Sequence, residues 1–467
     1  MHIQMKKPSF LTVIVLLLGQ VIGWAQTDEA HPLKVGAAKI DITPADQPVA
    51  PATGKYDHER AYIRAIVLDN SDTRAALISI EGRIENASCA ALLEELSDEL
   101  DCPVANIIIT TTHSHSVRMD RTAENQPKLV ADIIKDAVRQ ARAALQPAKM
   151  GYGKGACYLN VNRNAIDMDT RKWVQAPNLD GWSDKTVDII KFESPSGELI
   201  AVYMTYAMHP INAFASGVFS ADFPGAACRY VEKAFGDNIV VAFSQGASGD
   251  QNPIYIRTQL NAIHSRQSSE TTGIEVKGEP KEAPQRSNSS LRPVDPDALA
   301  NMFRMIETEG QILGEEVIQV MAMTRKTSSD VYIKGAQKTV SCPGRTRVNY
   351  SSSDPLSREG TPGEYEDGLD VDHHLAILGL GTAVIAACDG ELFSYIGMQL
   401  RKESPLTQTM FVTLTSTGQG RAPGYIPNDA AYGEQTFQVL KDRDKQGCAE
   451  RAIIDGLTEL ITDYITP

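Results

Sequence analysis

The stretch NIIITTTHSHS, residues 106–116, runs from branched apolar residues and threonines directly into two histidines. Its first half has the composition of a buried strand. In a strand, alternate side chains leave on the same face, so His113 and His115 are expected to point together at whatever lies beyond the strand end. That neighbour is water, a packing partner or a metal ion, and the rest of the chain must distinguish among these.

Outward from this strand, strand-like and helical patterns alternate along the chain. The strand-like runs, with alternating or continuous apolar residues, are 34–44, 61–70, 73–82, 186–194, 199–208 and 238–246. The segments with helical spacing are 89–100, 127–145 and 223–235. Residues 61–70 and 73–82 flank a polar Ser-Asp turn typical of a hairpin. We therefore expect an α/β fold with a mixed β-sheet core and flanking helices.

The N-terminus has the parts of a secretory signal peptide. Lys6 and Lys7 precede an apolar stretch, residues 10–21, that is too short to span a bilayer, and the small residues Gly23 and Ala25 follow. We expect residues 1–25 to be removed and the mature protein to be secreted or periplasmic, without an integral membrane segment.

The rest of the chain, residues 26–467, is expected to form one domain. Residues 264–298 are polar, rich in Ser, Pro and Glu, and without period. A long structureless stretch inside a domain is usually functional or disordered, so this one is interpreted as an insertion or lid.

Charge and cysteine content restrict the classes of partner. The formal net charge of −14 argues against nucleic acid, because phosphate binding depends on Lys and Arg. The seven cysteines form no CxxC pair, which argues against a cysteine-based zinc site. The seven cysteines allow one or two disulfides, but we expect most of them to be buried, unpaired thiols.

Ionisable side chains interrupt the apolar pattern at four places at or near strand ends. They are the His113–His115 pair, His209, Glu391 and Tyr425. Singly, each is ordinarily a structural or solvated residue. Together, two spaced histidines with a distant histidine and a distant carboxylate are a common way to assemble a Zn²⁺ site that keeps one position for water. Zinc lowers the pKa of such a water, which suits hydrolysis of an ester or amide.

These motifs resemble the catalytic domain of the neutral/alkaline, non-lysosomal ceramidase family, zinc amidases that cleave the N-acyl bond of ceramide. The resemblance extends over most of residues 33–440 and rests on the segments VGAAKIDITP, THSHS, NVNRN, YAMHP, DGEL and GYIPNDAAY. It implies four zinc ligands: His113, His209, Glu391 and Tyr425. It also implies that His115 faces the substrate and its oxyanion, and that Arg163 lies near the scissile group.

Two departures from the family pattern concern the reaction and the substrate. In GDQNP, Asn252 stands where the family has a serine implicated in catalysis. Asparagine cannot form an acyl-enzyme, but its amide can donate to an oxyanion or orient a substrate, so metal-activated water becomes the expected nucleophile. The family's C-terminal immunoglobulin-like domain is also not expected here.

The sequence thus predicts an exported zinc-dependent hydrolase that cleaves an N-acyl amide bond of a lipid or other small molecule. The alternatives are an esterase or deacylase acting on acylated glycans, and a non-catalytic binding protein that retains the metal pocket. A metal-free polysaccharide hydrolase would need two carboxylates in one cleft, and Asp222 and Asp250 are the candidates. Peripheral contact with a membrane stays open.

Overall fold

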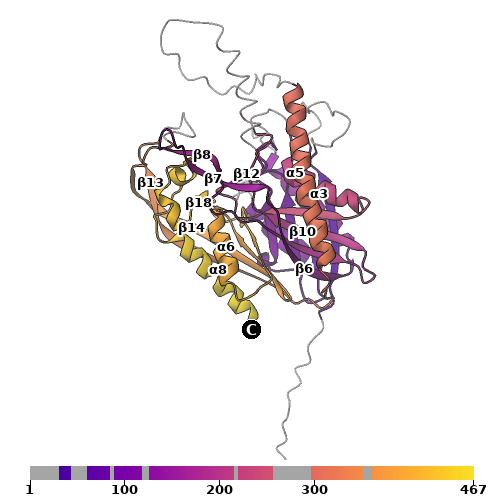
Figure 1. Ribbon diagram of the computed structural model, residues 1–467. Coiled ribbons are helices and arrows are strands. Elements are labelled where there is room, and N and C mark those ends of the chain that lie inside the picture. Colours follow the sequence, from indigo (N-terminus) through magenta and orange to yellow (C-terminus); the bar gives the residue numbers. More distant parts are fainter. Residues whose placement is uncertain are drawn as a thin grey trace, which may run out of the picture. The chain divides into compact units, whose positions relative to one another are not determined.

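The computed structural model describes residues 31–43, 60–84, 89–117, 126–214, 219–255, 296–350 and 359–466. The expected signal peptide, residues 1–25, and almost all of the polar insertion at 264–298 lie outside the described residues. The described elements are organised around three larger sheets and two small ones (Figure 1).

The first sheet contains the strand with which the sequence analysis began. Its order is β4 (Ile107–Thr111), β3 (Arg74–Ile80), β2 (Tyr62–Asp69), β1 (Lys34–Asp41) and β5 (Gln146–Pro147). The expected β2–β3 hairpin forms, and Ser71 in its turn has a left-handed φ of 74°. Helices α1 (Ala90–Leu100) and α2 (Gln126–Ala143) bury apolar residues such as Leu96 and Ile134 in a common core with one face of this sheet.

The second sheet has helices on its outer face. Its order is β11 (Val240–Gln245), β10 (Leu199–Tyr206), β9 (Thr186–Glu193) and β6 (Lys149–Ala156). Helices α3 (Asp222–Ala234) and α5 (Pro296–Met323) pack against each other (Figure 1). Their apolar stripes share a core with this sheet that contains Phe223, Phe243 and Leu313.

The third sheet is built from the C-terminal part of the chain. Its order is β13 (Ile333–Arg347), β14 (Tyr365–Leu380), β15 (Ala383–Cys388) and β17 (Thr409–Val412). Helices α6 (Ser394–Glu403) and α8 (Ala449–Ile465) pack on one face. A central apolar core joins this sheet to the other two, with Leu68, Tyr203 and Ile385 as examples from each.

Two small sheets connect the larger ones at the predicted site. One has the order β12 (Gln251–Pro253), β7 (Asn160–Ile166) and β8 (Trp173–Asn178), and the other pairs β16 (Glu391–Leu392) with β18 (Tyr425–Ile426). The short elements η2 (Val104–Asn106), η3 (Asp429–Gly433) and α7 (Phe437–Lys441) complete the described structure.

The expected fold class is confirmed. Parallel pairs, β3–β4, β10–β11 and β15–β17, occur beside antiparallel ones, so the sheets are mixed. Cys342 and Cys448 form a disulfide, and the other five cysteines are buried and form no disulfide. Within the described parts of the chain, no helix is long and apolar enough to cross a membrane.

Candidate metal centre

Three segments that follow strands carry the nearest candidate ligands. His113 comes just after β4, His209 follows β10, and Glu391 begins β16 shortly after β15. Open α/β sheets commonly place their sites beyond the carboxyl ends of strands. The apolar strands are buried in the cores, so the first polar residues beyond them meet in a common buried space.

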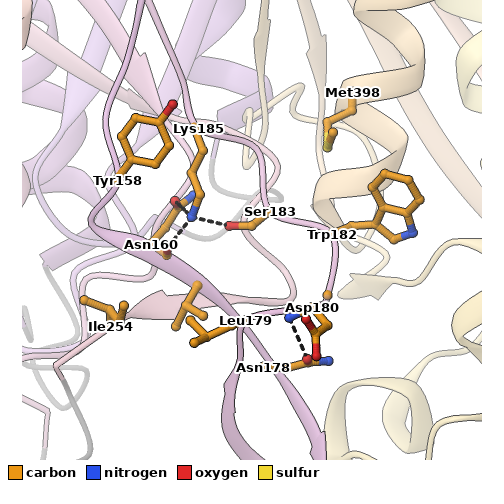
Figure 2. A pocket seen from close by; sticks show the side chains of 12 residues that line it. Tyr158, Asn160, Asn178, Leu179, Asp180, Trp182, Ser183, Lys185, Ile254 and Met398 are labelled. Atoms are coloured by element: carbon orange, nitrogen blue, oxygen red, sulfur yellow. Dashed lines mark hydrogen bonds between the residues drawn. The ribbon is translucent and has the colours of Figure 1, made fainter.

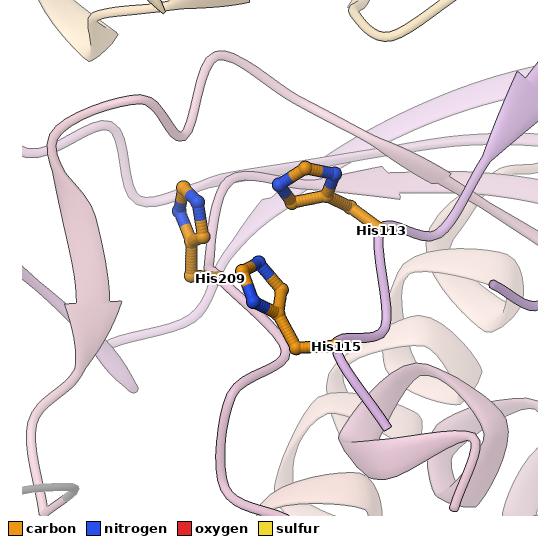
Figure 3. Close-up of side chains that lie close together, drawn as sticks. All are labelled: His113, His115 and His209. Atoms are coloured by element: carbon orange, nitrogen blue, oxygen red, sulfur yellow. The ribbon is translucent and has the colours of Figure 1, made fainter. Parts of the chain in front are cut away.

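The three histidine rings lie side by side (Figure 3). Ring centroids are 4.9 Å apart for His113 and His115, and 5.1 Å apart for His113 and His209. One ligand atom from each of the three residues lies within 4.8 Å of the other two. The Glu391 Oε2 atom is 3.2 Å from Nε2 of His113 and 3.3 Å from Nε2 of His209.

The two distances from Glu391 Oε2 to the histidine Nε2 atoms match the spacing of ligands around a tetrahedral zinc ion. Ligand atoms that each lie about 2.0–2.1 Å from such an ion are roughly 3.3 Å from one another. Among the described residues, His209 Nε2 and Glu391 Oε2 are buried and have no hydrogen-bond partner. Buried polar atoms are normally partnered, so two orphaned atoms at ligand spacing fit a site made for a cation.

The tautomer of His209 strengthens this argument. Its Nδ1 lies 2.8 Å from the carbonyl oxygen of Ser248, which can only accept, so Nδ1 carries the proton. Burial, with the Arg163 charge adding to it, lowers the pKa of His209 to about 3. At neutral pH the Nε2 lone pair therefore faces the Glu391 carboxylate, and two acceptors facing each other need a cation between them.

The ionisation states of His113 and Glu391 also suit a cation site. Burial lowers the pKa of His113, against the opposing effect of Glu391. Burial alone would raise the pKa of Glu391, but its contacts with His113 and His209 outweigh this and hold that pKa well below 4.5. A carboxylate with two neutral imidazoles is a donor set that zinc prefers.

Tyr425 is brought beside Glu391 by strand pairing. The two residues are Cα partners in the parallel β16–β18 pair, and the Glu391 N–H donates to the Gly424 carbonyl at 2.7 Å. The phenol ring stacks 6.5 Å from the His209 ring, and its hydroxyl interacts with Glu391 and Arg163. Burial raises the pKa of Tyr425 above its ordinary value, so direct contact with a cation would be needed to ionise it.

Gly249 permits the close approach of the strand that carries Glu391. A Cβ atom at this position would lie 2.4 Å from the Glu391 carbonyl oxygen, far inside contact distance. The Gly249 N–H donates to the Leu392 carbonyl at 2.7 Å. The small, polar stretch at 242–253 therefore lets one backbone approach another at the site.

Arg163 and Asn252 lie next to each other on the β7–β12 sheet. The Arg163 Nη1 donates to Asn252 Oδ1 at 3.2 Å, and Nη2 donates to the Gly249 carbonyl. The guanidinium also lies 5.6 Å from the centre of the Tyr425 ring. Since Oδ1 of Asn252 accepts from Arg163, its Nδ2 is the group that can donate to a ligand.

His115 and one residue that the sequence analysis missed form the other wall. His115 packs edge-on against His113 and Phe214, and its Nε2 contacts the Nη2 of Arg83. Arg83 Nη2 also lies 3.5 Å from His113 Nε2. Arg83 follows β3, the parallel neighbour of β4, and comes three residues after the apolar run AALISI. A single arginine in this place is too weak a signal to have found it.

His113 and His115 do not share a strand face, contrary to the expectation from alternating side chains. Strand β4 ends at Thr111, and His113 has a left-handed φ of 65°. The two rings meet because the loop turns after the strand, not because they share a strand face. A left-handed non-glycine residue is uncommon and is concentrated at functional sites.

The two carboxylates of the metal-free alternative do not form a pair. Asp222 is buried at the start of α3 and bonds Asn212 at 2.9 Å, whereas Asp250 is buried and bonds Asn162 at 2.9 Å. Among the described residues, no hydrogen bond or ion pair joins them, and a polysaccharide cleft of this kind is not supported.

A cavity of about 570 Å³ is lined partly by residues of β7 and β8 (Figure 2). The exposed rings of Tyr158 and Trp182 border it, and Lys185 donates to Ser183 inside it at 2.9 Å. None of the seven predicted site residues lines this cavity. It shares only strand β7 with the metal centre.

Fold and site together define an α/β protein with a buried centre of imidazole, carboxylate and phenol groups. No family model matches the chain. Neutral ceramidase of Pseudomonas aeruginosa is 23% identical over 216 residues, 42% of this chain and 32% of that protein. The chain thus aligns with only about a third of the length of this curated relative.

Solved structures show the likeness in fold. A structure described as ceramidase complexed with C2 superposes with a TM-score of 0.67 at 14% identity, covering 93% of this chain and 75% of the other. The crystal structure of neutral ceramidase from Pseudomonas aeruginosa gives a TM-score of 0.66 with the same identity and coverage. The resemblance inferred from the motifs is confirmed, and the chain has the fold of a neutral ceramidase.

Proposed function

We propose that this chain is a zinc-dependent hydrolase that cleaves the N-acyl amide bond of a ceramide-like lipid by means of activated water. One observation carries the proposal: two neutral imidazoles and a carboxylate face one another in a buried site, on the fold of a neutral ceramidase. The proposal includes an exported mature protein, with residues 1–25 as the signal peptide and one domain from residue 26.

The proposed zinc ligands are His113, His209, Glu391 and Tyr425. When bound there, zinc would supply a Lewis acid and bring the pKa of a water molecule near neutrality. The histidines remain neutral because burial opposes their charging. The carboxylate of Glu391 then offsets part of the charge of the ion.

The remaining site residues act on the carbonyl oxygen and the acyl group of the substrate. Burial and the neighbouring His113 lower the pKa of His115, so His115 is a neutral imidazole. Its Nε2 faces an Arg83 N–H, which leaves the Nδ1–H to donate to the substrate oxygen. Arg83 beside it is a permanent cation that stabilises negative charge on the substrate oxygen. Arg163 and the Nδ2 of Asn252, whose residues are joined by a hydrogen bond, would orient the acyl group.

The direct test combines metal analysis with a hydrolysis screen of the purified mature chain. We expect about one zinc per chain, and hydrolysis of N-acyl sphingoid bases that is lost with a chelator and restored by zinc. Protein with full zinc and no turnover of amides or esters would contradict the enzyme and favour the binding-protein alternative. Protein without zinc would contradict the metal centre itself.

A second candidate, an esterase or deacylase on acylated glycans, is favoured by Asn252 in place of the family serine. The same screen separates the two, because it contains acyl esters and acylated sugars beside N-acyl amides. Turnover of the acylated sugars alone would identify a glycan ester, and not a lipid amide, as the substrate. Asn252→Ser provides the matched variant, since it changes only the residue on which the alternative rests.

A further inference from the structure

A short segment far from the histidines is fixed firmly along β13. We name residues 442–448 the anchor segment. Its backbone bonds β13 twice, with Lys445 N–H donating to the Pro343 carbonyl at 2.9 Å and Arg345 N–H donating to the Arg443 carbonyl at 2.7 Å. At its end, Cys448 forms the disulfide with Cys342.

Two buried carboxylates fix the anchor segment on its inner side. Asp442 accepts from the Arg345 guanidinium at 3.0 Å, and Asp444 lies 2.9 Å from Nε2 of His373 on β14. Both aspartates are buried. The segment is thus held by backbone, side-chain and covalent links, which leaves the base of Arg443 little freedom to move.

From this base, the Arg443 side chain reaches the loop that precedes Tyr425. Its Nε and Nη2 donate to the Pro423 carbonyl at 3.2 and 3.0 Å, and Nη2 also donates to the Ala422 carbonyl at 3.0 Å. The next residue, Gly424, accepts the backbone hydrogen bond from Glu391. One guanidinium therefore holds the chain within two residues of Tyr425.

The loop has little means of its own to hold a fixed position. Gly418, Gly420 and Gly424 all have left-handed φ angles, of 71°, 52° and 91°. Glycine confers wide backbone freedom, and β18 has only two residues, too few for a strand to be independently stable. The position of the phenol must therefore be supported from outside the loop.

We propose that Arg443 is a positioning residue that keeps Tyr425 in reach of the metal centre by holding residues 422–423 to the anchor segment. The inference rests on the proposed function, because it gives Tyr425 its role as ligand. Arg443 itself touches neither the histidines nor Glu391 through any described hydrogen bond. Because Gly424 also bonds the Glu391 backbone, most but not all of the effect of Arg443 on zinc affinity is expected through Tyr425.

The test is a double-mutant cycle on zinc affinity, measured by competition with a chelator. Arg443→Met should weaken zinc binding roughly tenfold in the full chain, the scale usual for residues that orient ligands. In a Tyr425→Phe background, Arg443→Met should change the affinity less than twofold. Arg443→Lys, which keeps the charge and one donor, should recover part of the loss. Arg451→Met, which removes an exposed arginine of α8 paired with Glu403, is the matched control.

A second readout needs no metal. The bond after Arg421 lies in the held loop, so trypsin should cut it about tenfold faster in metal-free Arg443→Met protein than in wild type or Arg451→Met. An unchanged cutting rate, or an equal loss of zinc affinity in the Tyr425→Phe background, would overturn the inference. Wild-type protein that binds no zinc would contradict the proposed function, and the cutting rate would still decide whether Arg443 holds the loop.

Discussion

Two buried polar clusters in this protein solve the same electrostatic problem in opposite ways. Near α3, Glu232 accepts from Arg64 at 3.3 Å and from Lys39 at 2.6 Å, and Arg64 also pairs with Glu81. At the metal centre, the contacts of Glu391 among the described residues are with two neutral imidazoles and a phenol. In the first cluster the carboxylates pair directly with cations, whereas in the second Arg83 contacts the histidines, Arg163 contacts Tyr425, and Glu391 itself faces the Nε2 atoms of His113 and His209.

The pKa values reflect this difference. Burial alone would raise the pKa of Glu232, but Arg64 and Lys39 outweigh it and lower that pKa. A third arrangement lies beside the metal centre, where Glu434 accepts from Asn164 at 2.6 Å and no described salt bridge includes it. Burial raises the pKa of Glu434 to about 7. A carboxylate withdrawn from water is thus stabilised by a protein cation or by a proton, and the proposed zinc ion would do the same for Glu391.

The largest expected effect comes from removing His113, a proposed zinc ligand beside Glu391. His113→Ala should abolish tight zinc binding and lower kcat by at least about 10³-fold, because the water loses its activating ion. The folded metal-free protein should be no less stable than metal-free wild type, since one of the facing acceptors is gone. Zinc titration, kinetics and thermal unfolding measure the three quantities, and full metal content in the variant would refute the ligand assignment.

Removing Arg64, the cation shared by Glu81 and Glu232, should change stability and leave zinc binding unchanged. Arg64→Met leaves Glu81 and Glu232 buried without their main partner, which should lower the free energy of unfolding by about 3–5 kcal/mol. Zinc stoichiometry of the folded fraction should stay at the wild-type value. Denaturant unfolding and metal analysis are the measurements, and Arg451→Met is the exposed control. An Arg64→Met protein that was as stable as wild type but had lost its zinc would contradict the prediction.

Zinc should stabilise the folded protein through the Glu391 site and not through the Arg64 cluster. A ligand that binds the folded state alone adds about 2.7 kcal/mol when its free concentration is 100 times Kd. We expect this gain in wild type and in Arg64→Met, measured as a shift of the denaturant midpoint with buffered zinc. His113→Ala should show almost none of it. A gain of equal size in His113→Ala would place the ion elsewhere.

The smallest effect concerns the proton on Glu434. Because its folded pKa is raised from 4.5 to about 7, its contribution to stability is complete below pH 4.5 and is lost as the pH rises through 7. Glu434→Gln keeps the hydrogen bond but has no charge to bury, so it should stabilise the protein by about 1–2 kcal/mol at pH 8 and by little at pH 4.5. Unfolding curves at the two pH values test this, and a gain that did not depend on pH would contradict it.

Several parts of the site were accessible from the sequence because the signal was local. An apolar run that ends in His113, or a strand followed by His209, places a polar group where a buried strand stops. Glu391 and Tyr425 were recognised through family motifs, because neither a carboxylate after a Gly turn nor a loop tyrosine is distinctive by itself. Arg83 was missed, since a single arginine after a strand carries no pattern.

The sequence by itself determined the mixed α/β class, the hairpin and the main helices, because apolar periodicity depends on residues close together in the chain. It also showed that the chain is acidic and that isolated polar groups follow the strands. Only the tertiary structure decided that Glu391 would pair with Tyr425, that His113 would leave β4 with a left-handed backbone, and that Arg443 would reach the loop at 422–423. Contacts between segments distant in sequence arise from how the sheets pack, and no local pattern encodes that packing.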